Sequence, residues 1–203
     1  FNNSGQSCNA PTRMLVERSV YDAAVATAER VSNEMTVDIA SKNGRHIGPV
    51  VSRAQFDKIQ ALIESGQNEG ARLVAGGPGR PDGLEVGYFV RPTVFAEVSP
   101  EMTISRTEIF GPVLSITPFD TEDEAIALAN DTSFGLTNYV QTTDIERARR
   151  VAKRLRSGMV EMNGKPRSAG SPFGGYRQSG NGREGGTWGL EEFLEVKAVS
   201  GWA

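Results

Sequence analysis

The 203 residues are an ordinary globular mixture, with 38% hydrophobic and 23% charged side chains, 23 glycines and 10 prolines. A chain of this length buries roughly 70% of its unfolded surface when it folds as one domain, and the composition shows no signature of disorder. The net charge of −3 argues against a nucleic-acid or anionic-membrane partner, because such binding requires clustered excess cations.

A single cysteine, Cys8, rules out a disulfide within the chain. The sequence contains no signal peptide and no long apolar span, so we expect a soluble protein in a reducing, cytoplasmic compartment, with no membrane partner. The chain opens at Phe1 without an initiator methionine, and we expect it to be a piece of a longer protein. A processed terminus is the alternative.

Cys8 follows a turn-prone run, residues 2–5, and precedes an apolar, strand-like segment, residues 14–16. This position predicts a tight bend. Where a turn opens into a short helix, unpaired backbone N–H groups favour the thiolate and can hold an oxyanion formed beside it. The alternative is a buried, inert cysteine, since free cysteines are among the most buried residues.

Two amphipathic helices are predicted next along the chain. Ser19 and Asp22 resemble a capping box at the start of the first helix. Ser52 and Gln55 repeat that pattern at the start of the second, for which Gly66 supplies the predicted C-terminal stop. The only histidine, His46, falls between them and is predicted to be a surface residue on a loop.

The rest of the chain alternates strands and helices. Thr121 and Glu124 are predicted to cap a helix that ends near residue 131, and a second helix over 145–155 closes at Gly158. Alternation with short links predicts right-handed βαβ units, and hence an α/β fold with a mostly parallel sheet and helices on both faces. The predicted strands are 72–75, 113–116, 136–141 and 159–162, an extended segment at 88–98, and a final strand at 196–199 after a short helix at 190–194.

The helix over 144–157 carries six basic residues, a pattern that also occurs in nucleic-acid patches. Its apolar residues form one stripe, however, so the basic side chains are predicted to be its solvated face. The glycine-rich stretch 164–186 is longer than connections in compact domains usually are, which favours a functional loop. Loops that follow strands are where α/β proteins bind ligands.

Glu108 and Phe110 lie two residues apart, directly before the predicted strand at 113–116. In an extended chain this spacing places both side chains on one side, where the carboxylate can accept hydrogen bonds from a sugar diol and the ring can lie against a flat heterocycle. The alternative is a surface glutamate beside a core phenylalanine.

Three segments together resemble the aldehyde dehydrogenase superfamily. They are Gly5-Gln6-Ser7-Cys8, the stretch 108–112 and the loop 172–180. Members of that superfamily carry a GQxC nucleophile motif, an E-x-FGP motif and a PFGGxxxSG loop in this order. The match extends to residues 130–136 and 189–197, so that it covers nearly the whole chain.

The resemblance implies that the Cys8 thiolate attacks an aldehyde, that hydride passes to NAD or NADP, and that water or another acyl acceptor resolves the thioester. It implies that Glu108 binds the nicotinamide-side ribose and that Phe110 flanks the nicotinamide. Lys58 matches a lysine that reaches the cofactor ribose, with Gln55 as a possible companion. The alternatives are a solvated lysine and a capping-box glutamine.

Three further residues are assigned by the same resemblance. Leu136 matches a residue that lines the nicotinamide pocket, although it is also a candidate core leucine. Phe173 matches a wall of the aldehyde tunnel. Arg167 belongs to a variable segment that shapes specificity and is often aromatic or apolar in relatives, so the substrate class stays open. No metal ligand is expected.

Relatives place a dinucleotide-binding domain, an oxyanion-stabilising asparagine and a general-base glutamate before the nucleophile. We therefore expect residues 1–203 to be the catalytic domain without its cofactor domain, inactive alone as a dehydrogenase. One alternative is a weak esterase or acyl transferase at Cys8. Another is a non-catalytic assembly module. The resemblance implies that a strand from Val196 to Ala203, within an oligomerisation segment at 187–203, extends a sheet across a homo-oligomer interface.

Overall fold

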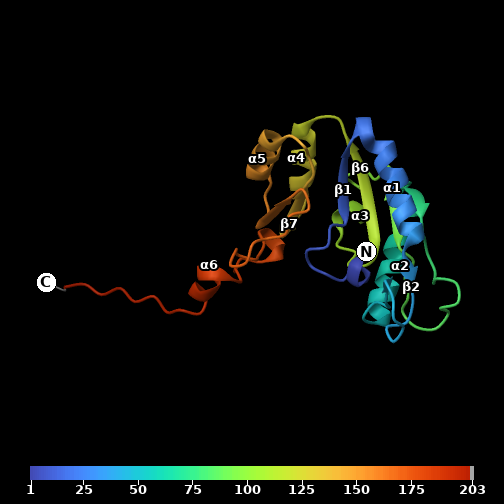
Figure 1. Cartoon of the computed structure of the whole chain (residues 1–203), viewed down its shortest axis with the longest axis horizontal. Coiled ribbons are helices and arrows are strands. Elements are labelled where there is room, and N and C mark those ends of the chain that lie inside the picture. Colours follow the sequence, from blue (N-terminus) through green and yellow to red (C-terminus); the bar gives the residue numbers. More distant parts are fainter. Residues whose placement is uncertain (202–203) are drawn as a thin grey trace. The chain divides into compact units, whose positions relative to one another are not determined.

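The helices and strands of the protein fall into two units in a computed structural model that describes residues 1–201 (Figure 1). Unit 1 comprises Phe1–Asp131, and unit 2 begins at Thr132. Within the described residues, no helix combines the length and the apolar character needed to cross a membrane.

Unit 1 is built on a four-stranded sheet of order β1-β6-β5-β4. Strand β6 pairs in parallel with both β1 and β5, whereas β4 lies antiparallel on β5. The mostly parallel sheet expected from the sequence is confirmed. The strand bounds are Arg13–Glu17 for β1, Arg72–Ala75 for β4, Thr93–Ala96 for β5 and Val113–Phe119 for β6.

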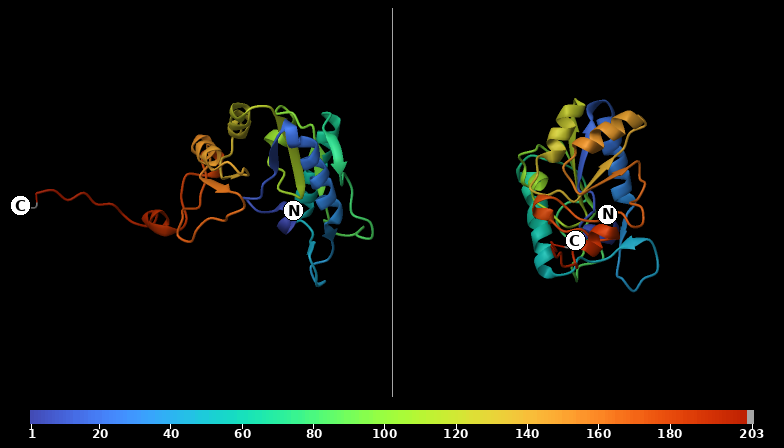
Figure 2. Two further views of the ribbon diagram at one scale, coloured as in Figure 1. Left: turned by 45° about the horizontal axis from the view of Figure 1, so that its top comes forward. Right: turned by 90° about the vertical axis from the view of Figure 1, so that its left-hand side faces the viewer.

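Helices α1 (Tyr21–Glu34) and α2 (Arg53–Asn68) cover opposite faces of this sheet (Figure 2). Successive strand residues point to opposite faces. On β5, Phe95 packs with Ile59 of α2, whereas its neighbours Val94 and Ala96 pack with Val25 of α1. The strand is therefore buried on both sides, as the expectation of helices on both faces requires.

Shorter elements complete unit 1. They are the 3₁₀ turns η1 (Asn2–Gly5) and η2 (Arg18–Val20), the paired two-residue strands β2 (Thr36–Val37) and β3 (His46–Ile47), and helices α3 (Thr103–Arg106) and α4 (Glu122–Asn130). His46 thus lies in a short strand and not on the predicted loop, because its segment pairs with β2.

Two of the three predicted helix caps are confirmed. The Ser52 hydroxyl accepts the Gln55 N–H at 3.2 Å, and Thr121 accepts the Glu124 N–H at 3.2 Å. The capping box predicted at Ser19 is wrong. Helix α1 begins two residues later, after the η2 turn, and the Ser19 hydroxyl donates instead to the Glu17 carboxylate at 3.1 Å.

The predicted helix stop at Gly66 is also wrong, because α2 continues to Asn68. A Cβ at Gly66 would lie 2.9 Å from Ile104 Cδ1, so this glycine serves the close packing of α3 on α2. Gly70, with a φ of 93°, adopts the left-handed backbone that follows the helix end.

We expect Ser52→Ala to lower the free energy of unfolding by about 1 kcal/mol, because α2 loses its N-cap acceptor. Ser19→Ala is the matched control and should cost less than about 0.5 kcal/mol, since this serine caps no helix. Urea denaturation of both variants measures the difference. Equal losses would contradict the assignment of the cap.

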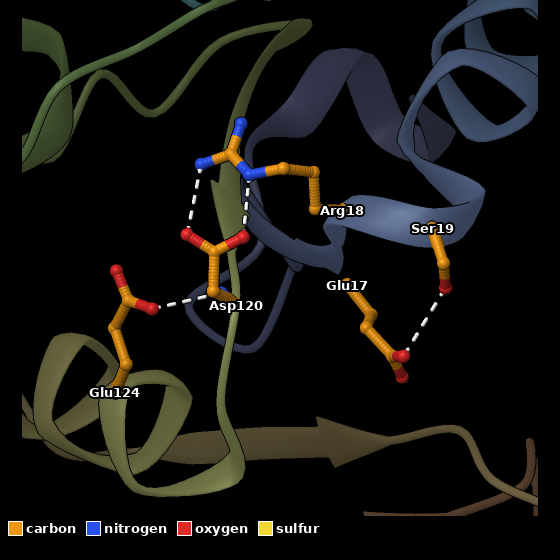
Figure 3. Close-up of polar contacts among 5 residues, drawn as sticks. All are labelled: Glu17, Arg18, Ser19, Asp120 and Glu124. Carbon is orange, nitrogen blue, oxygen red and sulfur yellow. Dashed lines mark hydrogen bonds and ion pairs between the residues drawn. The ribbon is translucent and has the colours of Figure 1, made fainter.

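An ion pair joins the chain just after β1 to the chain just after β6 (Figure 3). Arg18 Nε lies 2.5 Å from Asp120 Oδ1, and Arg18 Nη2 lies 3.2 Å from Oδ2. The Asp120 N–H in turn donates to the Glu124 carboxylate at 2.7 Å. Both charged side chains are exposed, so the pair adds little stability at physiological salt.

The hydrogen bond from Arg18, helped by its charge, holds the pKa of Asp120 below the ordinary value for aspartate. The resulting stabilisation is fully present above the unfolded-state pKa, about 3.9, and is lost as the pH falls through the lower folded-state pKa. Asp120→Asn should therefore lower the unfolding temperature slightly at neutral pH, and the difference should vanish in acid. Thermal melts from pH 7 to 2 test this, with Asp57→Asn as the charge control.

Unit 2 contains one βαβ arrangement. Strands β7 (Thr137–Val140) and β8 (Met159–Met162) pair in parallel and are joined by helix α5 (Ile145–Arg154). The glycine-rich stretch that follows forms a 3₁₀ turn, η3 (Arg177–Ser179), a bridge between Phe173 and Glu184, and helix α6 (Gly186–Glu191).

The predicted helix at 190–194 is displaced, because α6 begins at Gly186 and ends at Glu191. The strand predicted at 196–199 is absent from the described residues, and no neighbouring strand pairs with this segment there. Phe193 and Val196 are 88% and 97% exposed. The end of the predicted assembly segment, residues 202–203, lies outside the described residues.

Candidate active site

Cys8 lies at the end of a strained turn, residues 2–8, which we call the Cys8 turn. Three successive residues, Asn3, Ser4 and Gly5, have left-handed φ values of 51°, 54° and 73°. The Ala10 N–H then donates to the Ser7 carbonyl at 2.9 Å, which closes the bend around Cys8. The predicted tight bend is confirmed.

Two details of the prediction for Cys8 are wrong. No helix follows the cysteine directly, because the chain passes from the turn towards β1, and the nearest helical turn, η1, precedes Cys8. The buried-cysteine alternative also fails, since Cys8 is exposed. The thiol is therefore accessible to a small molecule.

Side chains of the Cys8 turn anchor it to residues 48–58, which lead into and form the first turns of α2. The Ser4 hydroxyl donates to the Gly48 carbonyl at 2.7 Å, and Ser4 itself is only 2% exposed. The Val51 N–H donates to Gln6 Oε1 at 2.8 Å. The sequence pattern did not reveal these anchors, because residues about 45 positions apart carry no local signal.

The same segment also holds the stretch 108–112, which we call the Phe110 loop. Gln55 Nε2 donates to the carbonyls of Ile109 at 3.0 Å and Phe110 at 2.8 Å. Lys58 Nζ donates to the Glu108 carbonyl at 2.7 Å. Residues predicted as a pair at the cofactor ribose thus both contact the Phe110 loop, and neither is merely a capping or solvated side chain.

The Cys8 turn and the Phe110 loop are in direct backbone contact. A Cβ built on Gly5 would lie 2.0 Å from the Gly111 carbonyl oxygen, so only glycine permits this approach. The structure therefore brings the nucleophile motif and the E-x-FGP motif together, although about 100 residues separate them in sequence.

The conformation of the Phe110 loop differs from the extended step that the sequence predicts. Phe110 has a φ of 56°, in the left-handed region that bulky side chains rarely adopt. Glu108 is exposed and Phe110 is half-buried. The phenylalanine is therefore not a core residue, and the carboxylate is free to meet a ligand.

One half-buried guanidinium lies further along the chain from Cys8, at the start of β1. Arg13 Nη2 donates to the Leu128 carbonyl at 2.8 Å, and burial lowers the pKa of Arg13 while the charge of Asp131 opposes that shift. Asp131 is also paired with Arg106 at 3.1 Å. The contact ties β1 to the end of α4.

Leu136, Phe173 and Arg167 belong to unit 2. Leu136 is half-buried directly before β7, where its carbonyl accepts the Met159 N–H at 3.0 Å. The Arg167 guanidinium lies 5.4 Å from the centroid of the Phe173 ring and donates to the Ser171 carbonyl. The two predicted substrate residues therefore lie against each other within this unit.

The sequence of residues 1–199 matches the model of the aldehyde dehydrogenase family. The chain belongs to this family of oxidoreductases. It is 53% identical over 200 residues to a 3-succinoylsemialdehyde-pyridine dehydrogenase of Pseudomonas sp, which covers 98% of this chain and 42% of that protein. A putative aldehyde dehydrogenase of Staphylococcus aureus is 48% identical, over 99% of this chain and 42% of its own length.

Solved structures agree with this assignment. An aldehyde dehydrogenase from Bartonella henselae superimposes with a TM-score of 0.97 at 60% identity, over 100% of this chain and 42% of that one. A cysteine-to-alanine mutant of aldehyde dehydrogenase C from Pseudomonas syringae, complexed with NAD+ and octanal, has a TM-score of 0.95 at 49% identity, over 98% and 41%. The chain thus spans about two fifths of the length of its relatives.

Proposed function

We propose that the full-length protein that contains this chain oxidises a small-molecule aldehyde to a carboxylate, with Cys8 as the nucleophile and NAD or NADP as the hydride acceptor. The observation that carries the proposal is the exposed thiol of Cys8 on a turn whose Gly5 touches the Gly111 carbonyl of the Phe110 loop. An accessible nucleophile and a carboxylate–aromatic pair are thereby held by one framework.

The chemistry on Cys8 follows the general scheme for covalent catalysis. The thiolate adds to the aldehyde carbon, a C–S bond forms, and the carbonyl electrons move to oxygen. The Cys8 backbone N–H is a candidate donor to that oxyanion. When the carbonyl reforms, the C–H bond breaks with its electron pair and a thioester remains. Water then adds to the thioester, the C–S bond breaks, and the carboxylate and the Cys8 thiolate are released.

The exposed side chains around the Phe110 loop suit a nicotinamide dinucleotide. Glu108 offers only acceptors, which match the two hydroxyl donors of a ribose diol, and Lys58 offers donors beside it. The half-buried Phe110 presents an aromatic surface. When bound, the nicotinamide supplies the acceptor for the hydride, while these side chains orient it.

Substrate selection is proposed to involve Phe173 and Arg167, with Leu136 in the nicotinamide pocket. One relative is named for a semialdehyde that bears a pyridine ring, and another was solved in complex with octanal. The Arg167 guanidinium over the Phe173 ring places a cation beside this aromatic side chain.

The test compares the full gene product with the 203-residue chain. The full-length protein should form NADH or NADPH from aldehydes at a measurable rate. The 203-residue chain should form none, because it corresponds to only 42% of the length of a dehydrogenase relative. An inactive full-length protein with intact folding would overturn the proposal. Turnover by the 203-residue chain that disappears in Cys8→Ala would overturn the expectation of an inactive fragment.

A second activity, acyl transfer from activated esters, is favoured by the exposure of Cys8. This reaction needs the thiol and an oxyanion donor but no dinucleotide. An activated ester should give a burst of product equal to the enzyme concentration, and Cys8→Ala should abolish the burst. A wild-type protein without a burst would exclude this activity.

An assembly role for residues 187–203 is supported by exposed apolar side chains at Leu190, Phe193 and Val196. Burial of such a strip against a second copy would remove it from water. We expect the full-length protein to be a homo-oligomer by light scattering, and removal of residues 192–203 to shift it to smaller species. A monomer at all concentrations would contradict this role.

A further inference from the structure

We propose that Gln55 is a positioning residue that sets the orientation of the Phe110 ring through the main chain. The inference rests on the proposed function, because the orientation of this ring affects activity only if a nicotinamide binds beside it. Its structural part depends only on contacts within unit 1.

The two hydrogen bonds of Gln55 fall on the two peptide groups that flank the Phe110 Cα atom. One goes to the Ile109 carbonyl at 3.0 Å and the other to the Phe110 carbonyl at 2.8 Å. Peptide groups are planar, so rotation of these two planes is what φ and ψ of Phe110 describe. A single side-chain amide therefore fixes both backbone angles of this residue.

This restraint is needed because the observed angle is unfavourable. Phe110 has a φ of 56°, where a Cβ atom approaches the neighbouring carbonyl oxygens. A return to ordinary extended angles would turn the two carbonyls apart, and one amide could no longer bind both. The direction of the Phe110 Cα–Cβ bond, and hence the place of its ring, follows from the angles that Gln55 holds.

The main chain around Phe110 uses both N–H donors of the Gln55 amide. This amide carries two N–H donors, and the two carbonyls take both. The amide nitrogen faces the two carbonyls because a carbonyl oxygen only accepts hydrogen bonds and the amide oxygen has no proton to donate. Gln55 is half-buried, whereas Lys58, one helical turn further on, is exposed.

The same restraint extends to the Cys8 turn. Gly111 follows Phe110 directly, and its carbonyl oxygen is the atom that Gly5 approaches. A Cβ on Gly111 would itself meet the side chain of Ile59 at 2.5 Å, so the loop has little room to shift. The Gln55 amide thus helps to hold the Phe110 ring in a fixed position relative to the turn that carries Cys8.

The experiment uses the full-length protein with Gln55→Met, which keeps length but has no donor, and Gln55→Glu, which keeps an acceptor oxygen but faces the carbonyls with a charge. Gln67→Met on the exposed side of α2 is the matched control. Single-turnover NADH formation should fall at least tenfold in both Gln55 variants. The cofactor Kd should change less than threefold, and the ester burst at Cys8 should keep its wild-type amplitude and rate.

A direct ligand role predicts a different pattern. A tenfold weaker Kd in Gln55→Met with an unchanged hydride-transfer rate, or a Gln55→Glu variant that matches the wild type, would overturn the proposal. A parallel loss of the ester burst would overturn it as well, because it would show that the substitution disturbs the whole site.

A thermodynamic cycle tests the positioning role without any aldehyde activity. Glycine adopts a left-handed φ freely, so Gln55→Met should lower the unfolding temperature less in a Phe110→Gly background than in the wild type. Equal shifts in the two backgrounds would overturn the proposal. Absence of NADH formation by the wild type would count against the proposed function alone, because the cycle does not depend on it.

Discussion

Cys8→Ala is expected to reduce aldehyde oxidation by the full-length protein by at least about 10³-fold, because the substitution removes the proposed nucleophile. These 203 residues contain no second cysteine, so no other thiol of this chain can substitute. Steady-state NADH or NADPH formation measures the loss, and mass spectrometry of the protein after an activated ester should show an acyl adduct only when Cys8 is present.

The matched control for this variant is Ser7→Ala. Ser7 is the residue before the nucleophile, and its carbonyl, which the substitution keeps, closes the turn at 2.9 Å from the Ala10 N. Its activity should stay within a few fold of the wild type. Activity of Cys8→Ala within tenfold of the wild type would show that the chemistry does not pass through this thiol.

Gly5→Ala is expected to lower the free energy of unfolding by roughly 2–5 kcal/mol and to abolish activity with it. The added Cβ would lie 2.0 Å from the Gly111 carbonyl oxygen, and a backbone atom cannot move aside as a flexible side chain does. The φ of 73° adds strain for any residue with a Cβ. Urea denaturation of the full-length protein measures the cost.

Gly83→Ala separates the two causes. Gly83 has nearly the same φ, 79°, but no atom within 4 Å of the position of a Cβ. Its substitution should therefore show the conformational strain alone, about 1 kcal/mol, with activity retained. A Gly5→Ala variant no less stable than Gly83→Ala would mean that the Cys8 turn and the Phe110 loop are not in the contact described.

Much of the fold could be predicted from local patterns. The strands at 72–75 and 159–162 have the expected bounds, and Ser52 and Thr121 cap helices as expected. These features depend on side chains and backbone groups within a few residues of each other, which a sequence displays directly. Family membership was equally visible, because its motifs are short and contiguous.

Errors arose where a distant segment decides the local structure. Glycine commonly ends helices, but Gly66 lies inside α2 and leaves room for Ile104 of α3. Serine commonly caps helices, but Ser19 lies in the η2 turn and donates a hydrogen bond to Glu17. The strand predicted at 196–199 has the right residues but no partner within the described chain. A strand needs a neighbour, whereas a helix satisfies its own backbone.

The sequence by itself determined that Cys8 is the lone thiol, that it stands on a bend and that its motifs are those of an aldehyde dehydrogenase. Only the tertiary structure decided that Gly5 contacts Gly111 and that Gln55 donates both of its amide hydrogen bonds to the backbone around Phe110. The reason is physical. Residues some 50 to 100 positions apart meet only when the sheet and its helices have formed, so their contacts leave no periodic or local signal in the sequence.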